Sequence, residues 1–296
     1  MHVAFIGFGL IGGSIARAVR NSTVRDRATR SRWRLQAWSP TGDGPARAVA
    51  DSVIDAAPAT PEETLAGAEL VVLAGPASAC LAALDNLAGP WRAALQPGAV
   101  ITDVASTKAA LLDRADAAGL RYVGGHPMAG LEMSGYAAAR ADLFVDRPWV
   151  IVPGRHADPP DVDRVVALAE ACRAHVVRMD AGTHDRAVAG ISHLPLVLAA
   201  ALVEAVAGVP GPDDDWNTAQ GLAAGGWRDM TRLARGDPGM GASIATTNAP
   251  ALAARLRDLR LVLDDWLAAL DRPGGPDETE LRERLRVARA RLDDPS

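Results

Sequence analysis

A glycine pattern near the N-terminus constrains the fold of this chain more than any other feature. The run Gly7-x-Gly9-x-x-Gly12 follows a short apolar segment, residues 2–6, and leads into apolar residues at helical spacing over 11–19. Strand, glycine turn and helix in that order form the phosphate-binding corner of a dinucleotide fold. Gly7 permits the tight turn, Gly9 lets the backbone approach a pyrophosphate, and Gly12 lets the helix lie close to the strand. The pattern predicts a bound dinucleotide with its phosphates on the first amides of the helix.

Apolar segments typical of strands alternate with helical segments as far as residue 179. The expected strands are 2–6, 35–38, 52–54, 70–73, 99–102, 121–123 and 149–152, followed by a helix–strand unit over 161–179. The expected helices in this part include 11–19, 76–87 and 107–118. Such alternation predicts a mostly parallel sheet with helices on both faces.

After Asp180 the strand pattern ends. Helices are expected over 184–206, 216–234, 246–270 and 277–292, separated by breaks rich in glycine and proline. The sequence therefore predicts an α/β protein in which a Rossmann-type dinucleotide-binding domain, residues 1–179, precedes an all-helical domain, residues 180–296.

Composition excludes several classes of partner. The formal net charge of −5 argues against a general nucleic-acid or anionic-membrane binder, although a single arginine can still bind a small anionic substrate. Cys80 and Cys172 are the two cysteines, and both lie in apolar helical runs, so we expect buried thiols and neither a disulfide framework nor a metal site. Met1 runs directly into the first strand without a targeting segment. These features predict a cytoplasmic protein.

The longest apolar run, residues 194–210, resembles a membrane span at first sight. It is shorter than the roughly 20 residues that a bilayer requires, and Glu204 interrupts it. The expectation is a buried helix in a helical core and no membrane contact.

Cofactor contacts are expected at the ends of the first strands. The expected set is Gly7, Phe8, Gly9, Leu10, Ile11, Gly12, Ser39, Pro40, Thr41, Ala74, Gly75, Pro76, Asp103 and Ser106. The second strand of such folds usually ends in an acid that binds the adenosine ribose, and Ser39 occupies that place here. No charge there repels a 2′-phosphate, and Ser39 or Thr41 could bond to one, although no arginine follows immediately and Asp43 could fold back to the ribose. NADP, or use of both NAD and NADP, is favoured over strict NAD.

A histidine lies in a glycine-rich segment, Gly124-Gly125-His126-Pro127, beyond the cofactor strands. Its neutral imidazole has a pKa suited to accepting a hydroxyl proton while hydride leaves the same carbon. The two glycines are expected to let this loop approach the substrate. The combination predicts a dehydrogenase whose base is His126.

Further motifs follow in a fixed order along the chain. They are Gly-x-Gly-x-x-Gly-Gly-Ser at 7–14, Asp103-x-x-Ser106-x-Lys108, the segment 125–130 with Glu132, Ser134 and Gly135, His184-Asp185, residues 192–195, and residues 225–232. With these motifs the chain resembles the prephenate/arogenate dehydrogenase family of tyrosine biosynthesis. The resemblance covers roughly the first 240 residues, and the helical remainder is similar to the dimerisation domain of that family. It implies a homodimer.

The resemblance also implies the reaction: oxidation at the ring C4 hydroxyl of a cyclohexadienyl substrate, arogenate or prephenate, coupled to loss of CO2 without a metal. His126 and Ser106 would be catalytic, with Ser106 bonding the reacting hydroxyl or the nicotinamide amide. Arg232 would bind the ring carboxylate through its guanidinium fork. The other expected substrate contacts are His193, Gly130 and Glu132. Asp185 would hold a basic partner.

Simpler structural roles are also open for these side chains. Ser106 is placed to cap the helix expected at 107–118, alone or together with a catalytic role. Lys108 either supports the cofactor site or is solvated, Arg232 could be a solvated helix charge, and His193 could only cap or pack.

Departures from the family pattern bear on the substrate. Leu196 stands where many prephenate-using members carry a second histidine, which favours arogenate unless another residue substitutes. Met133 stands where a lysine is common.

Other functions fit the same plan. An amino-substituted prephenate of specialised metabolism would require nearly the same residues. A β-hydroxyacid dehydrogenase or imine reductase is the nearest rival, but residues 180–204 lack the lysine that β-hydroxyacid enzymes use. A non-catalytic, nucleotide-sensing dimer would need neither a base at position 126 nor an anion clamp at position 232.

Overall fold

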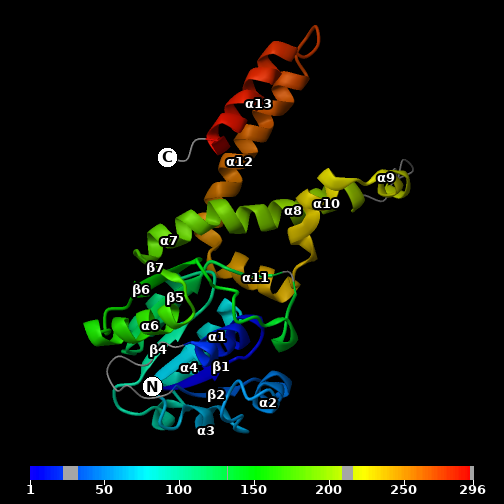
Figure 1. Cartoon of the computed structure of the whole chain (residues 1–296). Helices are drawn as coiled ribbons and strands as arrows, with labels where there is room; N and C mark the ends of the chain where they lie inside the picture. The colour runs from blue at the N-terminus through cyan, green and yellow to red at the C-terminus, as the bar shows by residue number, and fades with distance from the viewer. Residues whose placement is uncertain (23–32, 132, 209–215, 294–296) are drawn as a thin grey trace. The chain divides into compact units, whose positions relative to one another are not determined.

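The computed structural model describes residues 1–22, 33–131, 133–208 and 216–293. A seven-stranded sheet of order β2-β1-β3-β4-β5-β6-β7 forms its centre (Figure 1). The strands are β1 (His2–Ile6), β2 (Arg34–Trp38), β3 (Leu70–Leu73), β4 (Val100–Asp103), β5 (Tyr122–Pro127), β6 (Pro148–Pro153) and β7 (His175–Arg178). All neighbours pair in parallel except β5 and β6, which are antiparallel. The α/β fold of the Rossmann type is confirmed.

Helices and short helical turns connect and follow the strands. In the first part they are α1 (Leu10–Asn21), α2 (Asp43–Ala50), α3 (Pro61–Leu65), α4 (Ala77–Ala88), η1 (Arg92–Ala94), α5 (Ala109–Ala117), η2 (Tyr136–Ala138) and α6 (Pro159–Ala171). After β7 come α7 (Ala181–Val188), η3 (Ala189–His193), α8 (Leu194–Ala207), α9 (Trp216–Leu222), α10 (Gly225–Thr231), η4 (Arg232–Arg235), α11 (Pro238–Thr247), α12 (Ala249–Leu270) and α13 (Glu278–Asp293).

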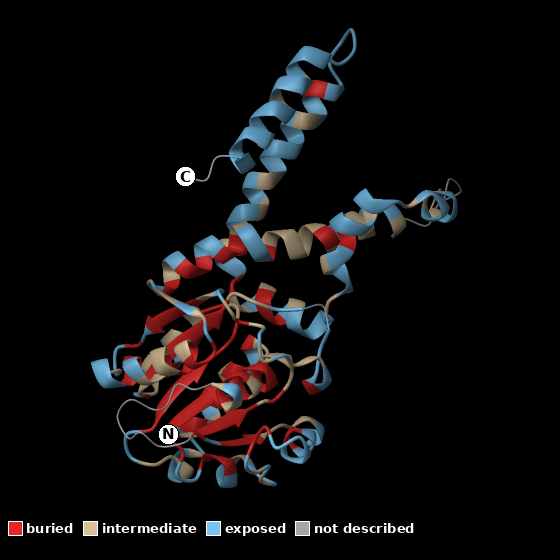
Figure 2. Ribbon diagram, in the orientation of Figure 1, coloured by how far each residue is buried: buried red, intermediate tan, exposed pale blue. Residues whose placement is uncertain are grey.

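Most residues of the strands are buried (Figure 2). Their alternating side chains fill two cores, one on each face of the sheet. In β1, Val3 and Phe5 belong to one core, whereas Ala4 and Ile6 belong to the other. Helices α1 and α6 supply the first core, and α3, α4 and α5 supply the second. Burial on both faces is what continuous apolar strands of a parallel sheet require. Cys80 and Cys172 are free and buried, as expected.

One expected strand is absent. Residues 52–54 form a turn after α2, in which Ser52 has a φ of 58° and the Val53 N–H donates to the Ala48 carbonyl. Val53 and Ile54 are buried there, so their side chains enter the core without a strand. Only an isolated bridge between Gln36 and Ala56 extends the sheet among the described residues. The strand prediction for 52–54 was wrong because two buried apolar residues satisfy either conformation.

Helices α7 and α8 form one continuous helical rod, Ala181–Ala207, through the π-helical turn η3. In η3 the Leu194 N–H donates to the Ala189 carbonyl, and Pro195 follows, which has no N–H to donate to the preceding turn. The rod is long and apolar enough to cross a membrane by length and composition, and 22% of its most apolar window is buried. Within α8 only Ala199 is buried. The predicted burial of this helix was wrong, because the described helices cover only part of its apolar surface.

The chain divides into two compact units, residues 1–249 and residues 250–296. The second unit contains most of α12 and all of α13. Within it the Arg284 guanidinium lies 4.3 Å from the centroid of the Trp266 ring and donates to the Asp265 carbonyl at 3.1 Å.

Candidate active site

The glycine turn after β1 has the geometry that the sequence predicts. Gly7 has a φ of 86°, a left-handed conformation that glycine adopts without strain. Its N–H donates to the Trp38 carbonyl at 2.8 Å, which holds the turn against β2. A Cβ at Gly7 would lie 3.0 Å from the backbone carbon of Ala74. The turn is therefore closed in by the end of β3 and tolerates no side chain.

The start of α1 is open to a ligand. A Cβ at Gly9 would meet no atom within 4 Å, whereas a Cβ at Gly12 would lie 3.2 Å from that of Ala74. Gly9 caps the helix without a side-chain hydrogen bond, so the first N–H groups of α1, from Leu10 and Ile11 onward, lack side-chain acceptors. An uncapped helix start with room above it fits the pyrophosphate of a dinucleotide. Phe8 turns away, because its ring is buried and stacks on Tyr136 with the centroids 5.7 Å apart.

Two further strand ends lie beside this turn. Ser39 is half-buried directly after β2, and Pro40 and Thr41 are exposed. Asp43 is the first residue of α2 and is exposed, so the end of β2 itself carries no acid. After β3, Ala74, Gly75 and Pro76 are half-buried. These residues come from adjacent parallel strands, whose carboxyl ends share one edge of the sheet.

Asp103 and Lys108 form a buried ion pair behind that edge. Both side chains are fully buried, and the Lys108 Nζ contacts Asp103 Oδ1. Asp103 also accepts hydrogen bonds from the Ala105 N–H at 2.8 Å, the Gly125 N–H at 3.3 Å and the hydroxyl of Tyr122. Of the two alternatives for Lys108, solvation is therefore excluded. With its carboxylate occupied, Asp103 organises the loop from β4 to α5 and has no side-chain oxygen left for a cofactor.

Lys108 has a second distinction: it is the only lysine in the sequence. All other basic residues of the Lys/Arg type are arginine.

Two glycines of β5 lie against this ion pair. A Cβ at Gly124 would lie 3.1 Å from the Cδ of Lys108, and a Cβ at Gly125 would lie 2.6 Å from the Asp103 carbonyl oxygen. The two glycines therefore make room for Lys108 and Asp103.

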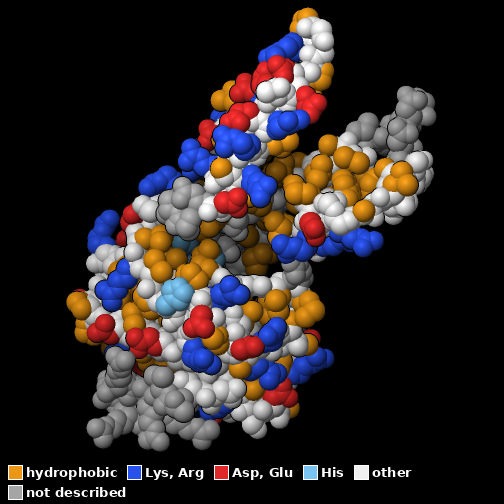
Figure 3. Space-filling model, turned by 45° about the horizontal axis from the view of Figure 1, so that its top comes forward, with side chains coloured by type: hydrophobic (Ala, Val, Ile, Leu, Met, Phe, Trp, Pro, Cys, Tyr) orange, Lys and Arg blue, Asp and Glu red, His pale blue; other side chains and the backbone are white. Residues whose placement is uncertain are grey.

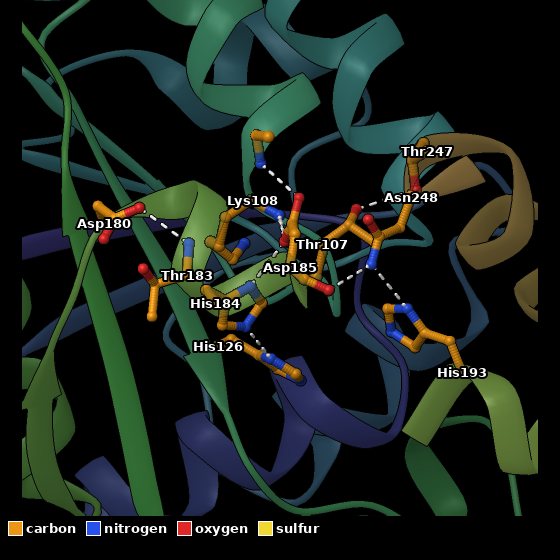
Figure 4. A network of polar contacts seen from close by, with 12 residues as sticks. Thr107, Lys108, His126, Asp180, Thr183, His184, Asp185, His193, Thr247 and Asn248 are labelled. Carbon is orange, nitrogen blue, oxygen red and sulfur yellow. Dashed lines mark hydrogen bonds and ion pairs between the residues drawn. The ribbon is translucent and has the colours of Figure 1, made fainter. Parts of the chain in front are cut away.

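His126 belongs to strand β5 and not to a loop, which corrects the expectation for this segment. It pairs with Val150 of the antiparallel strand β6 and is 8% exposed. Its Nδ1 lies 2.8 Å from His184 Nε2, and His184 Nδ1 lies 2.7 Å from Asp185 Oδ1 (Figure 4). Three side chains from β5 and α7 thus form one hydrogen-bonded row, which we call the histidine row.

The surroundings of His126 favour its neutral form. Burial lowers the pKa of His126 well below its usual value, and the positive charge of Lys108 and the rings of His184 and His193 lower it further. For Asp185, burial opposes ionisation. Its hydrogen bonds from the His184 ring and from the backbone of Ala109 and Lys108 outweigh this effect, so the pKa of Asp185 is lowered.

Asp185 also caps helix α5. It accepts the Lys108 N–H at 2.8 Å and the Ala109 N–H at 2.9 Å. The partner of this carboxylate is therefore a helix start and His184, and not the basic side chain that we expected. Ser106 is half-buried in the loop before α5, and it does not cap the helix because α5 begins at Ala109. The capping alternative for Ser106 is therefore excluded, and its hydroxyl has no hydrogen-bond partner in the part of the chain that the structure describes.

His193 closes the site from the π-helical turn η3. It is 1% exposed, and Asn248 Nδ2 lies 3.0 Å from its Nδ1 and 2.9 Å from the Asp185 carbonyl (Figure 4). Its Nε2 is buried and has no partner among the described residues. His193 is held beside the backbone of Ser106, and burial lowers its pKa. Asn248 and the backbone of Ser106 therefore fix the His193 ring, whose Nε2 is enclosed by protein.

The remaining predicted substrate residues lie in exposed positions. Arg232 is the first residue of η4, a turn that packs against α8, and it is exposed. Gly130 is exposed after β5. Glu132 lies outside the described residues.

Sequence reasoning missed the roles of His184 and Asn248. The adjacent pair His184-Asp185, which begins four residues after the helix-capping Asp180, was a visible signal, because it places two ionisable side chains in the first turns of a long helical rod. Asn248 gave no comparable signal, since its position between two helices is typical of many solvent-facing residues.

A dinucleotide-binding turn and a buried histidine at the same edge of the sheet are typical of a nicotinamide-dependent dehydrogenase. Two family models match the chain. The model for the prephenate dehydrogenase nucleotide-binding domain matches residues 41–178, and the model for the prephenate dehydrogenase dimerization domain matches residues 180–286. The chain belongs to the prephenate dehydrogenase family.

Individual relatives agree with this membership. Prephenate dehydrogenase of Bacillus subtilis is 31% identical over 273 residues, which are 91% of this chain and 68% of the relative. The crystal structure of Synechocystis arogenate dehydrogenase superposes with a TM-score of 0.78 at 32% identity and covers 99% of both chains. Prephenate dehydrogenase from Aquifex aeolicus, in complex with hydroxyphenyl propionate and NAD+, gives a TM-score of 0.84 at 25% identity, covering 99% of this chain and 98% of that one.

Proposed function

We propose that this protein is a cytoplasmic NAD(P)-dependent dehydrogenase that oxidatively decarboxylates a cyclohexadienyl substrate, arogenate or prephenate. Residues 1–179 would hold the dinucleotide and residues 180–296 would complete the substrate site. The observation that carries the proposal is the buried imidazole of His126 near the carboxyl end of β5, at the sheet edge that also carries the dinucleotide corner, in surroundings that lower its pKa. The family match and the relatives that act on arogenate and prephenate support the choice of substrate class.

The side chains of the site suit this reaction. His126 accepts the proton of the C4 hydroxyl, and Ser106 bonds to that hydroxyl or to the coenzyme amide. A bound nicotinamide supplies the acceptor for the hydride that leaves C4. Loss of the ring carboxylate as CO2 then leaves a phenolate oxygen, which takes a proton back. Arg232 binds that carboxylate before it leaves, and the Nε2 of His193 donates to the substrate. Gly130 and Glu132 are the other substrate contacts that we propose.

The decisive experiment compares four reactions. It measures kcat/KM for arogenate and for prephenate, each with NAD and with NADP, from the absorbance of the reduced coenzyme. Turnover of either substrate supports the proposed reaction, and the four values rank substrates and coenzymes. No turnover with any pair would refute arogenate and prephenate as substrates and favour an amino-substituted prephenate, which the same residues would bind.

Leu196 bears on the substrate side chain. The residue is half-buried in α8, and its Cδ2 would lie 3.6 Å from a Cβ at Gly241 of α11. An apolar side chain here offers no hydrogen bond to the keto acid of prephenate. This observation favours arogenate as the better substrate.

Arg232→Gln is expected to raise KM for the anionic substrate by roughly 10-fold to 10²-fold, with a smaller change in kcat. A guanidinium that binds the ring carboxylate contributes about 1.5–3 kcal/mol to the binding free energy of the substrate through charged hydrogen bonds. Steady-state kinetics measure the effect. Arg235→Gln, at the other end of the same exposed turn, is the matched control and should leave KM unchanged. Equal KM values for both variants would contradict the proposed role of Arg232 in binding the substrate.

Ser39→Asp is expected to lower kcat/KM for NADP by at least about 10-fold, with little change for NAD. A carboxylate at the end of β2 would repel a 2′-phosphate and accept hydrogen bonds from an unmodified ribose. The ratio of kcat/KM for the two coenzymes measures the effect. Thr41→Asp, two residues along in the exposed loop, is the comparison that tests whether the position at β2 matters. An unchanged ratio in Ser39→Asp would contradict the prediction that the 2′ position of the adenosine ribose lies near residue 39.

The pH profile of kcat/KM should have its acid limb well below pH 6.5, the ordinary pKa of histidine. A base acts only when neutral, so activity is present above the pKa of His126 and is lost as the pH falls through it. Burial, with Lys108, His184 and His193 facing the ring, lowers that pKa. An acid limb centred at or above the ordinary value would contradict His126 as the base in this environment.

We also propose a homodimer through the helical part. Figure 3 shows apolar side chains gathered along the arm that contains α8 and α10. Exposed members of these helices and of α9 include Val206, Leu222 and Met230, at 43%, 78% and 54% exposure. Exposed apolar surface of this kind marks an interaction site. The matched dimerization domain supports a second copy as the partner, which sedimentation equilibrium tests.

A further inference from the structure

The proposed reaction uses only one member of the histidine row. His126, His184 and Asp185 are 8%, 1% and 4% exposed, and their contacts of 2.8 Å and 2.7 Å run in one line from β5 to α7 (Figure 4). A buried chain of this length, with no solvent to compete, fixes the donor and acceptor at each position. The inference below rests on the proposed function of His126 as the base.

The direction of the row follows from its anionic end. An ionised carboxylate only accepts hydrogen bonds, and Asp185 already accepts two backbone N–H groups. His184 must therefore donate its Nδ1–H to Asp185. With the single ring hydrogen of His184 on Nδ1, its Nε2 is the acceptor of the 2.8 Å contact, and the Nδ1 of His126 carries the hydrogen between the two rings.

We infer that His184 is a positioning residue that holds His126 in its Nδ1–H tautomer, with Asp185 anchoring the arrangement. In this tautomer the lone pair of His126 lies on Nε2, the nitrogen that the row leaves unused. The opposite tautomer would present an N–H at that nitrogen and could not accept the hydroxyl proton. When Nε2 gains the proton, the Nδ1–H of the resulting imidazolium stays bonded to His184, and no proton moves along the row.

Asp185 is a poor residue on which to test this inference, because its carboxylate also caps α5. His184 is better, because its side-chain hydrogen bonds within the described part of the chain are the two that form the row. His184→Gln places an amide oxygen near the former Nε2, where it can still accept the His126 Nδ1–H. His184→Leu fills similar space and accepts nothing.

The first test needs neither substrate nor coenzyme. Long-range 1H–15N spectra of protein labelled at its six histidines, assigned with single variants, distinguish the two tautomers of a neutral imidazole. We expect His126 as the Nδ1–H tautomer in the wild type and in His184→Gln, and loss of that preference in His184→Leu. A wild-type His126 that is protonated on Nε2, or a tautomer unchanged in His184→Leu, overturns the inference.

Kinetics then separate positioning from folding. We expect His184→Leu to lower kcat by at least about 10²-fold at nearly constant KM, and His184→Gln to remain within about 10-fold of the wild type, within the range for a positioned acid–base group. Equal kcat in the two variants, with kcat following thermal stability alone, would make the row a structural contact and overturn the inference. If neither arogenate nor prephenate is turned over, the proposed substrates fail, whereas the spectra still decide the tautomer.

Discussion

His126→Asn is expected to lower kcat by roughly 10²-fold to 10⁴-fold, the range for a positioned acid–base group. Asparagine keeps an N–H that can donate to His184 Nε2, so the histidine row and the fold should survive, but its amide is no base at neutral pH. KM should change little. Stopped-flow and steady-state measurements of coenzyme reduction provide the rates.

His175→Asn is the matched control for this variant. His175 is exposed at the start of β7, in the same sheet, and should leave kcat unchanged. Near-normal turnover in His126→Asn, with an intact fold by circular dichroism, would remove His126 from the mechanism.

Lys108→Met is expected to destabilise the protein by about 3–5 kcal/mol, because it leaves the buried carboxylate of Asp103 without its cation. For a chain of this size the loss corresponds to a fall in Tm of roughly 10 °C. Thermal unfolding followed by calorimetry measures it. The effect arises from an unpaired buried charge, since methionine has nearly the volume of lysine.

The double variant Asp103→Asn/Lys108→Met tests that cause. It removes both charges, so its loss of stability should be smaller than the sum of the two single losses. Additive losses would show that the ion pair contributes no coupling and that packing alone explains the single variants.

Much of the sheet could be predicted because local pattern and tertiary environment agree there. The apolar run of β1 and the glycines at 7, 9 and 12 require one conformation, and the structure has it. Residues 52–54 failed because Val53 and Ile54 can enter a core from a turn as well as from a strand. The extent of β5 was underestimated, because the partner that lengthens it, β6, is antiparallel and follows only after residue 147.

The sequence indicated which residues to consider for the site, but not which hydrogen bonds connect them. The sequence identified His126 as the candidate base, but the contact of His126 with His184 depends on β5 and α7 lying side by side although the two residues are 58 positions apart in the chain. The same holds for Asp185, whose helix-capping role needs the start of α5. The apolar character of α8 was evident, yet its exposure was not, because a monomer sequence gives no indication of what surface a second copy would cover.

The single lysine offers a practical consequence. Since every other basic residue is arginine, lysine-selective isotopic labelling would give one ammonium resonance, and its Nζ is fully enclosed beside Asp103. Amine-reactive reagents would reach this nitrogen only when the centre of the molecule opens. The rate at which the Lys108 amine is acylated would therefore measure how often the structure opens locally around the ion pair with Asp103.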